Sequence, residues 1–261
     1  MAETSKTTAI LDQGNKSFIC IYLVRDAALN VRNCPDPDSE AGAREYRAEH
    51  GDALLRLGLA HLTGTAPADW QIGRAPAGGP IVRQNQATQN LLHLSLSHSG
   101  NYLVAGICTA APIGVDIERH RKRRFTEIAE HLDWPGVVRD PPVPLQADSF
   151  YHLWTLWEAA IKVCSTEPGT LAASVFNLII PGLAVGTPNA RSTQDWLARS
   201  WQCPGNFWLS VIAGCPVAPD IRLFLVDGLE SAEETTQIHE IANDNGILDP
   251  QIFHQAPSET I

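Results

Sequence analysis

Three acidic side chains and a lysine have spacings that would bring them together. Asp116 and Glu118 are two residues apart in the apolar segment 112–118, which we expect to be a strand, so their side chains point to one side. Glu158 and Lys162 are four residues apart in an expected helix and share a face. Converging carboxylates repel one another unless a cation lies between them, and oxygen ligands favour Mg²⁺ or Mn²⁺ over zinc. The same spacing also fits solvated strand-end charges and an ordinary surface ion pair.

A second polar motif, Ser97-His98-Ser99-Gly100, separates the runs 92–96 and 102–108, which we expect to be strands. We expect the end of the segment 97–101, which is small and polar, to be a hairpin-type turn. Hydroxyls, exposed backbone N–H groups and an imidazole suit a phosphate oxygen. Taken alone, His98 fits a structural histidine better than a ligand.

The hydrophobic pattern predicts the elements that must position these groups. We expect strands at 17–24, 92–96, 102–108 and 112–118, and sheet-forming runs over 174–226. We expect helices at 41–62 with a break at Gly51, at 125–132, and from a cap at Asp148 or Ser149 to Cys164. In the last helix we expect an apolar stripe and a polar one, made respectively by Phe150, Trp154, Trp157, Ile161 and by Tyr151, Thr155, Glu158, Lys162.

These elements predict an α+β fold of two halves of similar size that meet near residue 110. The expected divisions are a flexible tail (1–16), an N-terminal half (17–109), a C-terminal half (110–228) and an acidic peripheral tail (229–261) with one weak helical stretch.

Composition excludes several classes of protein. The chain has 261 residues and a formal net charge of −10, which disfavours nucleic acid as a partner. No apolar run approaches the ~20 residues of a membrane helix, and the polar start is unlike a secretory signal. The six cysteines include no Cys-x-x-Cys pair, so we expect neither a disulfide nor a zinc framework. A reduced, cytoplasmic setting fits best.

Taken together, the order of motifs resembles the 4'-phosphopantetheinyl transferase superfamily, in its larger Sfp-type members. The resemblance covers roughly residues 40–170. It implies two similar α+β halves related by a pseudo-twofold axis, with the active site at their interface. It depends on the pairing of two motifs in the order Gly114-Val115-Asp116-Ile117-Glu118 and Trp154-Thr155-x-x-Glu158-Ala159-x-x-Lys162.

The resemblance implies a magnesium-dependent transfer of the phosphopantetheine arm of coenzyme A to a carrier-protein serine, with release of adenosine 3',5'-bisphosphate, by an enzyme that is usually monomeric. Asp116, Glu118 and Glu158 would hold Mg²⁺ (or Mn²⁺). Glu158, directly or through a water, would accept the serine proton. The expected coenzyme A residues are Lys162, Ser97, His98, Arg47, Arg74 and the turn Gly78-Gly79-Pro80, with Arg44 a weaker candidate.

The chain departs from the family pattern near the expected substrate. Trp157 stands where the family often has a lysine. Gly79 stands where the family often has the lysine of a Gly-Lys-Pro motif, and Val163-Cys164-Ser165 replaces the common Ala-x-Gly pattern. A charge-assisted hydrogen bond contributes roughly 1.5–3 kcal/mol, so two missing cations would weaken coenzyme A binding. Trp157 also suits packing on the apolar stripe.

A cationic segment of five residues follows the expected metal strand: His120, Arg121, Lys122, Arg123 and Arg124. Beside an active site it would attract an acidic carrier domain. It is equally consistent with a solvated junction between strand and helix.

Three alternatives remain. A degenerate family member would bind coenzyme A or a protein without transfer. A magnesium-dependent nuclease would use a Glu-x-Lys strand, but His120 stands where that lysine belongs. A serine hydrolase using His98 would need a Gly-x-Ser-x-Gly elbow, which the sequence lacks, and an acid partner that we cannot assign.

Overall fold

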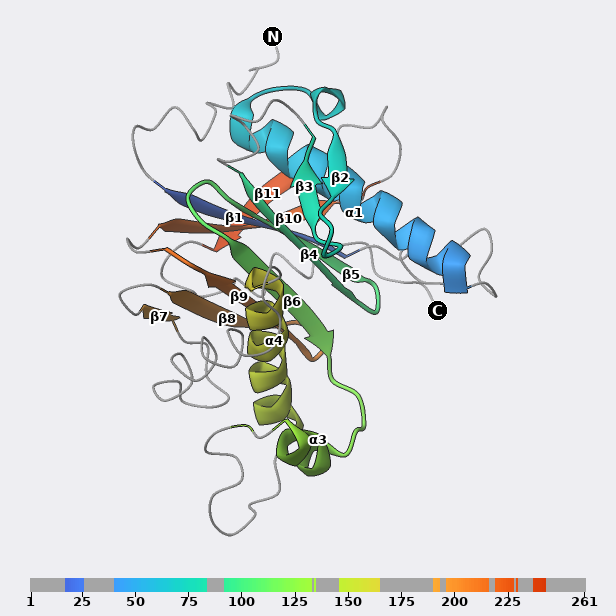
Figure 1. The fold of residues 1–261 in the computed structure, drawn as a ribbon, viewed down its shortest axis with the longest axis vertical. Helices are drawn as coiled ribbons and strands as arrows, with labels where there is room; N and C mark the ends of the chain where they lie inside the picture. Colours follow the sequence, from blue (N-terminus) through green and yellow to red (C-terminus); the bar gives the residue numbers. More distant parts are fainter. Residues whose placement is uncertain are drawn as a thin grey trace.

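A computed structural model describes residues 17–25, 40–83, 92–132, 134, 146–164, 190–192, 196–215, 219–227, 229 and 237–242. Helices and two main β-sheets make up this part of the chain (Figure 1), which confirms the predicted α+β class. The pseudo-twofold relation and the boundaries of the halves stay predictions.

The first sheet has five strands and is assembled from distant parts of the chain. In spatial order they are β11 (Gln237–Ala242), β10 (Asp220–Asp227), β1 (Phe18–Arg25), β5 (Tyr102–Cys108) and β4 (His93–Ser99). β1 pairs parallel with β10 and antiparallel with β5, and β4 forms one edge. Two strands of this sheet thus come from beyond residue 110.

The second sheet is antiparallel and has four strands. In spatial order they are β6 (Ile113–Arg119), β9 (Phe207–Ala213), β8 (Leu197–Cys203) and β7 (Ala190–Ser192). β6 forms one edge of this sheet, as β4 does of the first. A short hairpin of β2 (Ile72–Arg74) and β3 (Pro80–Val82) lies apart from both sheets.

Four helical segments complete the described fold. They are α1 (Glu40–Thr63), a 3₁₀ turn (Pro67–Asp69), α3 (Phe125–His131) and α4 (Ala147–Val163). The predicted break at Gly51 is wrong, because α1 continues through it. A Cβ at Gly51 would lie 3.0 Å from Leu96 Cδ1, so the small residue lets the helix pass close to β4. That close packing overrides the low helix propensity of glycine.

The core has three parts, which explains why β1 is apolar on both faces. Phe18, Tyr22 and neighbouring side chains of one parity pack with α1, and Ile19 and Ile21 of the other parity pack with Val115 of the second sheet. α4 packs on the opposite face of the second sheet, as Figure 1 shows. The order of layers is therefore α1, first sheet, second sheet, α4.

The expected faces of α4 are only partly right: Phe150 is buried and Glu158 and Lys162 are not, but two residues of the expected polar stripe are buried. Its buried side chains are Phe150, Tyr151, His152, Leu153, Thr155, Leu156, Ala159, Ala160 and Val163. Tyr151 and Thr155, expected on the polar stripe, are buried, and their hydroxyls find hydrogen-bond partners there: Tyr151 Oη bonds to the backbone of Arg121, and Thr155 Oγ1 lies 2.7 Å from Ser210 Oγ. Trp154, Trp157 and Ile161 are only partly buried at the rim of the α4 core cluster.

The expected cap of α4 is also wrong. Gln146 is the N-cap residue, and it makes no side-chain capping bond. Asp148 lies in the first turn, where its Oδ1 accepts hydrogen bonds from Trp208 Nε1 at 2.9 Å and Gln202 Nε2 at 3.0 Å. This carboxylate therefore ties the start of α4 to the second sheet.

Within the stretch expected as an acidic peripheral tail, residues 237–242 form strand β11. β11 pairs antiparallel with β10, and Ile241 is buried. These six residues therefore belong to the first sheet. In the described part of the chain, no helix is long and apolar enough to cross a membrane, and the five described cysteines are free and buried.

Candidate active site

The edge strands β4 and β6 are joined by serine hydroxyls. Three alternate serines of β4 accept hydrogen bonds from backbone N–H groups of β6. The pairs are Val115 N to Ser95 Oγ (3.0 Å), Ile117 N to Ser97 Oγ (3.3 Å) and Arg119 N to Ser99 Oγ (3.0 Å). We call these three residues the serine ladder. The serine ladder joins the edge of the first sheet to the edge of the second. At this seam, serine hydroxyls of β4 take the place of the backbone carbonyls that would pair with β6 in a continuous sheet.

Two serines of the ladder also hold the acidic side chains of β6. Ser97 Oγ donates to Asp116 Oδ1 at 2.7 Å, and Ser99 Oγ donates to Glu118 Oε2 at 2.9 Å. Asp116 and Glu118 therefore lie on one side of β6, as the spacing predicts. Two of the serines that join the sheets therefore also hold the acidic cluster in place.

The turn expected at the end of the segment 97–101 is confirmed at Gly100 and Asn101, and β4 continues through Ser99, beyond the expected strand 92–96. Strand alternation separates Ser97 and Ser99 from His98. Ser97 and Ser99 are buried toward β6, and His98 is exposed on the other side. The two serine hydroxyls thus face β6, whereas the His98 imidazole lies on the opposite side of the strand.

Helix α4 contributes Glu158 and Lys162 because its backbone packs directly on β6. A Cβ at Gly114 would overlap the carbonyl oxygen of Ala159 and lie 2.8 Å from Val163 N. Backbone atoms cannot yield as a flexible side chain does, so only glycine permits this approach. At this crossing, Lys162 Nζ donates to Asp116 Oδ1 at 2.7 Å and to Val115 O at 3.0 Å.

The three carboxylates share a partly dehydrated environment. Burial is the main cause that raises the pKa of Asp116, Glu118 and Glu158 above their ordinary values. The charge of Asp116 raises the pKa of the other two further, while Lys162 opposes the rise at Asp116 and Glu158. Because the charge of another carboxylate raises the pKa of both Glu118 and Glu158, a cation among the three groups would relieve the repulsion.

The donor set fits a magnesium-type ion in chemistry. Asp116 is 5% exposed, and its Oδ2 is buried without a hydrogen-bond partner among the described residues. An unpaired buried carboxylate oxygen is costly, and a hard cation satisfies it. As they stand, however, no three Asp, Glu, His or Cys residues of the described part are grouped closely enough to hold a metal ion. The three carboxylates lie in one region, but they are not close enough together to coordinate a single ion.

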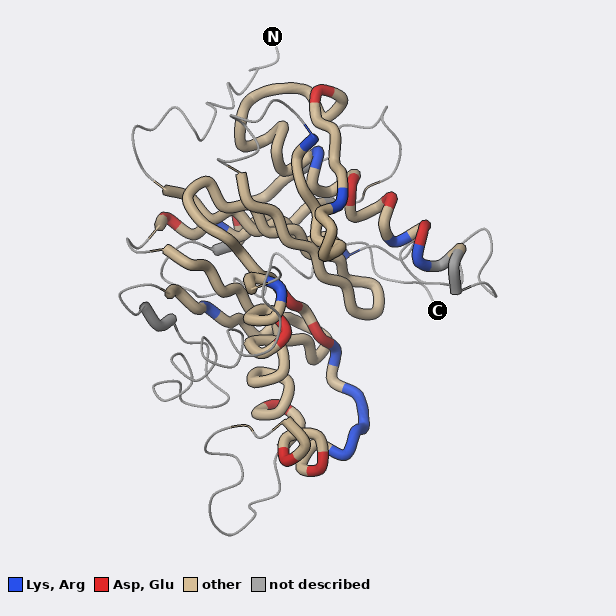
Figure 2. Tube along the Cα trace, in the orientation of Figure 1, with Lys and Arg blue, Asp and Glu red and all other residues tan. Residues whose placement is uncertain are grey.

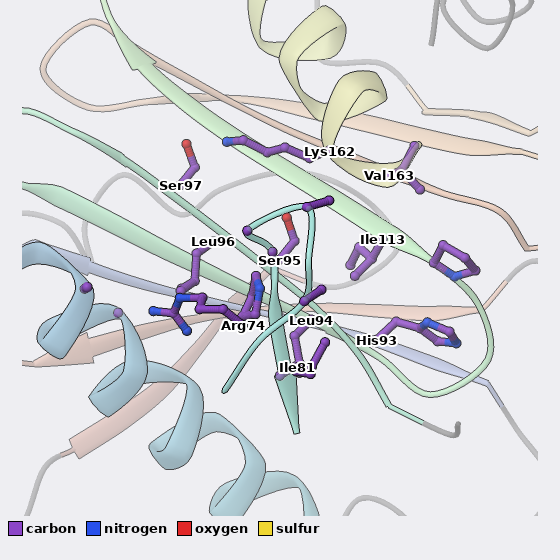
Figure 3. Close-up of a pocket in the computed structure, with 18 of the residues that line it drawn as sticks. Arg74, Ile81, His93, Leu94, Ser95, Leu96, Ser97, Ile113, Lys162 and Val163 are labelled. Carbon is purple, nitrogen blue, oxygen red and sulfur yellow. The ribbon is translucent and has the colours of Figure 1, made fainter. Parts of the chain in front are cut away.

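A cavity of about 1180 Å³ adjoins this cluster (Figure 3). It is larger than the ~300–1,000 Å³ of an ordinary ligand pocket, so it accommodates a long ligand. It brings together every residue expected to bind coenzyme A: Arg47, Arg74, Gly78, Gly79, Pro80, Ser97, His98 and Lys162, together with Arg44. Figure 3 shows Lys162 reaching from α4 toward Ser97.

One wall of the cavity is cationic. His98 is accessible from the cavity that it lines, and its pKa is lowered, first by desolvation from the surrounding atoms and then by the charges of Arg47 and Lys162. Arg74 Nη2 forms an ion pair with Asp52 at 2.7 Å. Gly78 has φ +91°, which the tight turn over residues 75–79 requires.

The opposite part of the cavity is apolar, and the sequence did not indicate it. Its lining includes Ile81, Leu94, Ile113 and Val163, with His93 beside them. These residues come from four different elements, so no local pattern connects them. The alternation Ser95-x-Ser97-x-Ser99, by contrast, was a readable sign of the serine ladder.

The basic segment after β6 runs along the connection to α3 (Figure 2). Arg121, Lys122 and Arg124 are exposed. Tyr151 fixes its start, since its hydroxyl accepts from Arg121 N at 2.9 Å and donates to Arg121 O at 3.1 Å. Arg123 lies 5.7 Å from the Trp154 ring and lowers the pKa of Glu118 and Glu158 by its charge, although burial keeps both raised.

The chain was compared with known proteins. It is 32% identical over 123 residues to a 4'-phosphopantetheinyl transferase of Bacillus subtilis, covering 45% of this chain and 51% of the relative. It is 36% identical over 120 residues to 4'-phosphopantetheinyl transferase psf-1 of Bacillus pumilus (43% and 47%). It is 25% identical over 172 residues to putative 4'-phosphopantetheinyl transferase slr0495 of a Synechocystis species (60% and 67%).

The resemblance to 4'-phosphopantetheinyl transferases is confirmed. In the first two of these matches the aligned region spans about half the length of the relative. No family model matches the chain.

The departures from the phosphopantetheinyl transferase pattern have visible places in the fold. Trp157 is partly buried against the α4 core cluster, which confirms its packing role. Gly79 lines the cavity, and a Cβ built on it meets nothing within 4 Å. The first departure therefore serves stability, while the second leaves open space in the cationic wall.

Proposed function

We propose that this protein transfers the 4'-phosphopantetheine arm of coenzyme A to a serine of an acyl or peptidyl carrier protein, in a magnesium-dependent reaction. The serine oxygen forms a bond to the β-phosphorus of the pyrophosphate, and the bond from that phosphorus to the bridging oxygen breaks. Adenosine 3',5'-bisphosphate leaves with that oxygen.

One observation carries the proposal: a large cavity with a cationic wall ends at an acidic cluster that contains a lysine. Arg47, Arg74 and His98 line the part suited to the phosphates of a nucleotide. Lys162 belongs both to the cavity and to the acidic cluster. A polyanionic ligand in this cavity would bring its pyrophosphate beside the carboxylates.

The residues of the chain suit the separate parts of this reaction. Lys162 is positioned to neutralise a phosphate oxygen once it exchanges Asp116 for the substrate. The raised pKa of Glu158 brings it closer to the pH at which a carboxylate is an effective proton acceptor, so Glu158 is our candidate base for the serine hydroxyl.

Asp116, Glu118 and Glu158 would hold Mg²⁺, with Mn²⁺ as a substitute. When bound, the ion would stabilise negative charge on the pyrophosphate. The carboxylates themselves keep Lys162 oriented toward the cavity through the Asp116 contact of 2.7 Å.

The carrier would dock beside the basic segment 120–124. Its exposed Arg121, Lys122 and Arg124 would attract an acidic domain over a distance set by ionic strength. The expectations of a cytoplasmic, monomeric protein without nucleic-acid or membrane partners remain part of this proposal.

The test is incubation of the full chain with coenzyme A, Mg²⁺ and a panel of apo-carrier proteins, followed by mass spectrometry of the carriers. We expect one carrier to gain the mass of one phosphopantetheine arm, and the gain to disappear when its acceptor serine is replaced by alanine. EDTA should prevent the gain, and added Mg²⁺ should restore it.

A second candidate is a protein that binds coenzyme A without transferring the arm. The direct contact of Lys162 with Asp116 and the open space at Gly79 favour it. Coenzyme A binding by calorimetry, with no mass gain on any carrier in the panel, would support this candidate against the transferase.

A further inference from the structure

Ser99 has two contacts that no motif accounts for. Its hydroxyl accepts from Arg119 N at 3.0 Å and donates to Glu118 Oε2 at 2.9 Å. Ser99 is 5% exposed, so water does not compete freely for these bonds. It lies outside the lining of the cavity. Its role is therefore separate from contact with a substrate.

The hydrogen bond holds Glu118 in one orientation. Because its Oε2 accepts from the Ser99 hydroxyl at 2.9 Å, a side chain with three rotatable bonds is restricted in its rotamers. A metal ligand requires this restriction, because neighbouring hydrogen bonds orient the groups that bind a cation.

The ladder contains its own control. Ser95 accepts from Val115 N at 3.0 Å, just as Ser99 accepts from Arg119 N. The residue before Val115 is Gly114, which offers no carboxylate, whereas the residue before Arg119 is Glu118. The two serines thus make the same contact across the seam and differ in the acidic partner.

We propose that Ser99 is a positioning residue of the metal site: by accepting from β6 and donating to Glu118 at once, it fixes a ligand for the divalent ion against the edge of the first sheet. This inference rests on the metal site of the proposed function. It makes docking of the two sheets a condition for metal affinity.

The test measures metal binding without any transfer reaction. Mn²⁺ is titrated into the full chain, alone and with coenzyme A, and free Mn²⁺ is followed by electron paramagnetic resonance. We expect Ser99→Ala to weaken Mn²⁺ binding by about 10–100-fold, the range for loss of a residue that orients a ligand. Because Ser95 lines the cavity, its variant is compared without coenzyme A. There we expect Ser95→Ala to keep the wild-type affinity for Mn²⁺ and Ser99→Thr to recover most of it.

Thermal unfolding in EDTA tests whether the variants are folded. Equal affinity in Ser99→Ala and wild type would overturn the inference while leaving the metal site intact. An equal loss in Ser95→Ala would overturn it as well, because the effect would then belong to the seam in general. A wild type that binds no Mn²⁺ under either condition would overturn the metal site and this inference together, whereas absence of transfer with these affinities unchanged would overturn only the proposed activity.

Discussion

The two sides of the candidate site differ in charge and in how tightly they are built. On the side of β6 and α4, Asp116 and Glu118 are bound by serines and Lys162, and glycine at 114 lets the backbones meet. On the side of α1 and the β2–β3 hairpin, Arg44 and Arg74 are exposed, and the wall has open space at Gly79.

The difference separates two tasks. A tightly held acidic side suits chemistry, which depends on the exact orientation of charges. A looser cationic side suits binding, because charge attraction tolerates small displacements. We therefore expect changes on the acidic side to reduce kcat, and changes on the cationic side to alter KM for coenzyme A. Three kinetic experiments test this division, and one pH experiment tests the core beneath the acidic side; they run from the largest expected effect to the smallest.

Glu158→Gln should reduce kcat by roughly 1,000-fold, since a metal contact contributes several kcal/mol to a transition state of this kind. The variant removes a half-buried charge that Asp116 and Glu118 repel, so its unfolding temperature in EDTA should equal or exceed that of the wild type. Steady-state kinetics and a thermal melt measure the two effects. Wild-type turnover in Glu158→Gln would contradict the acidic side as the site of chemistry.

Arg47→Ala should raise KM for coenzyme A by about 10–100-fold and leave kcat nearly unchanged, because a lost hydrogen bond to a charged group costs roughly 1.5–3 kcal/mol. Arg56→Ala, on the same helix but outside the cavity lining, is the matched control and should behave as wild type. A fall in kcat with unchanged KM would instead assign Arg47 to the chemical step.

The core beneath the acidic side should respond to pH. His152 is fully buried, its ring is stacked on Trp208 at 4.4 Å, and burial lowers its pKa to about 4. The unfolded chain binds a proton near the ordinary value of 6.5 and the folded chain does not, so stability is full above that pH and falls as the pH drops toward the folded value.

From pH 7 to pH 5, His152 should contribute a loss of roughly 2 kcal/mol. His152→Phe cannot take up the proton, so the wild type should lose about that much more free energy of unfolding than this variant. Urea unfolding at both pH values measures the difference. Parallel losses in the two proteins would assign the acid sensitivity to other groups.

Gly79→Lys should lower KM for coenzyme A by about 3–10-fold, since it adds a cation to a partly exposed wall, where solvent weakens the contact. The structure has room for a side chain there, and the backbone at Gly79 does not have the positive φ found at Gly78. Gly79→Gln is the uncharged control. Equal KM values for the two variants would show that charge at this position does not reach the substrate.

Several local features were predictable from the sequence because they depend on neighbours in the chain. The strand with Asp116 and Glu118 on one side follows from the period of two, and the proximity of Glu158 to Lys162 follows from the helical period. Other predictions were wrong because they considered only neighbours in the chain. Gly51 is a weak helix former, which led us to expect a break, yet its packing against Leu96 keeps it inside α1.

What the sequence by itself determined was which side chains share a face of one strand or one helix, since local periodicity decides that. Only the tertiary structure decided that β4 and β6 meet through alternating serines, that Gly114 admits α4, and that arginines distant in the chain line one cavity with Lys162. These contacts join segments far apart in the chain, and their formation depends on burial shared by two sheets, which no short stretch of residues specifies.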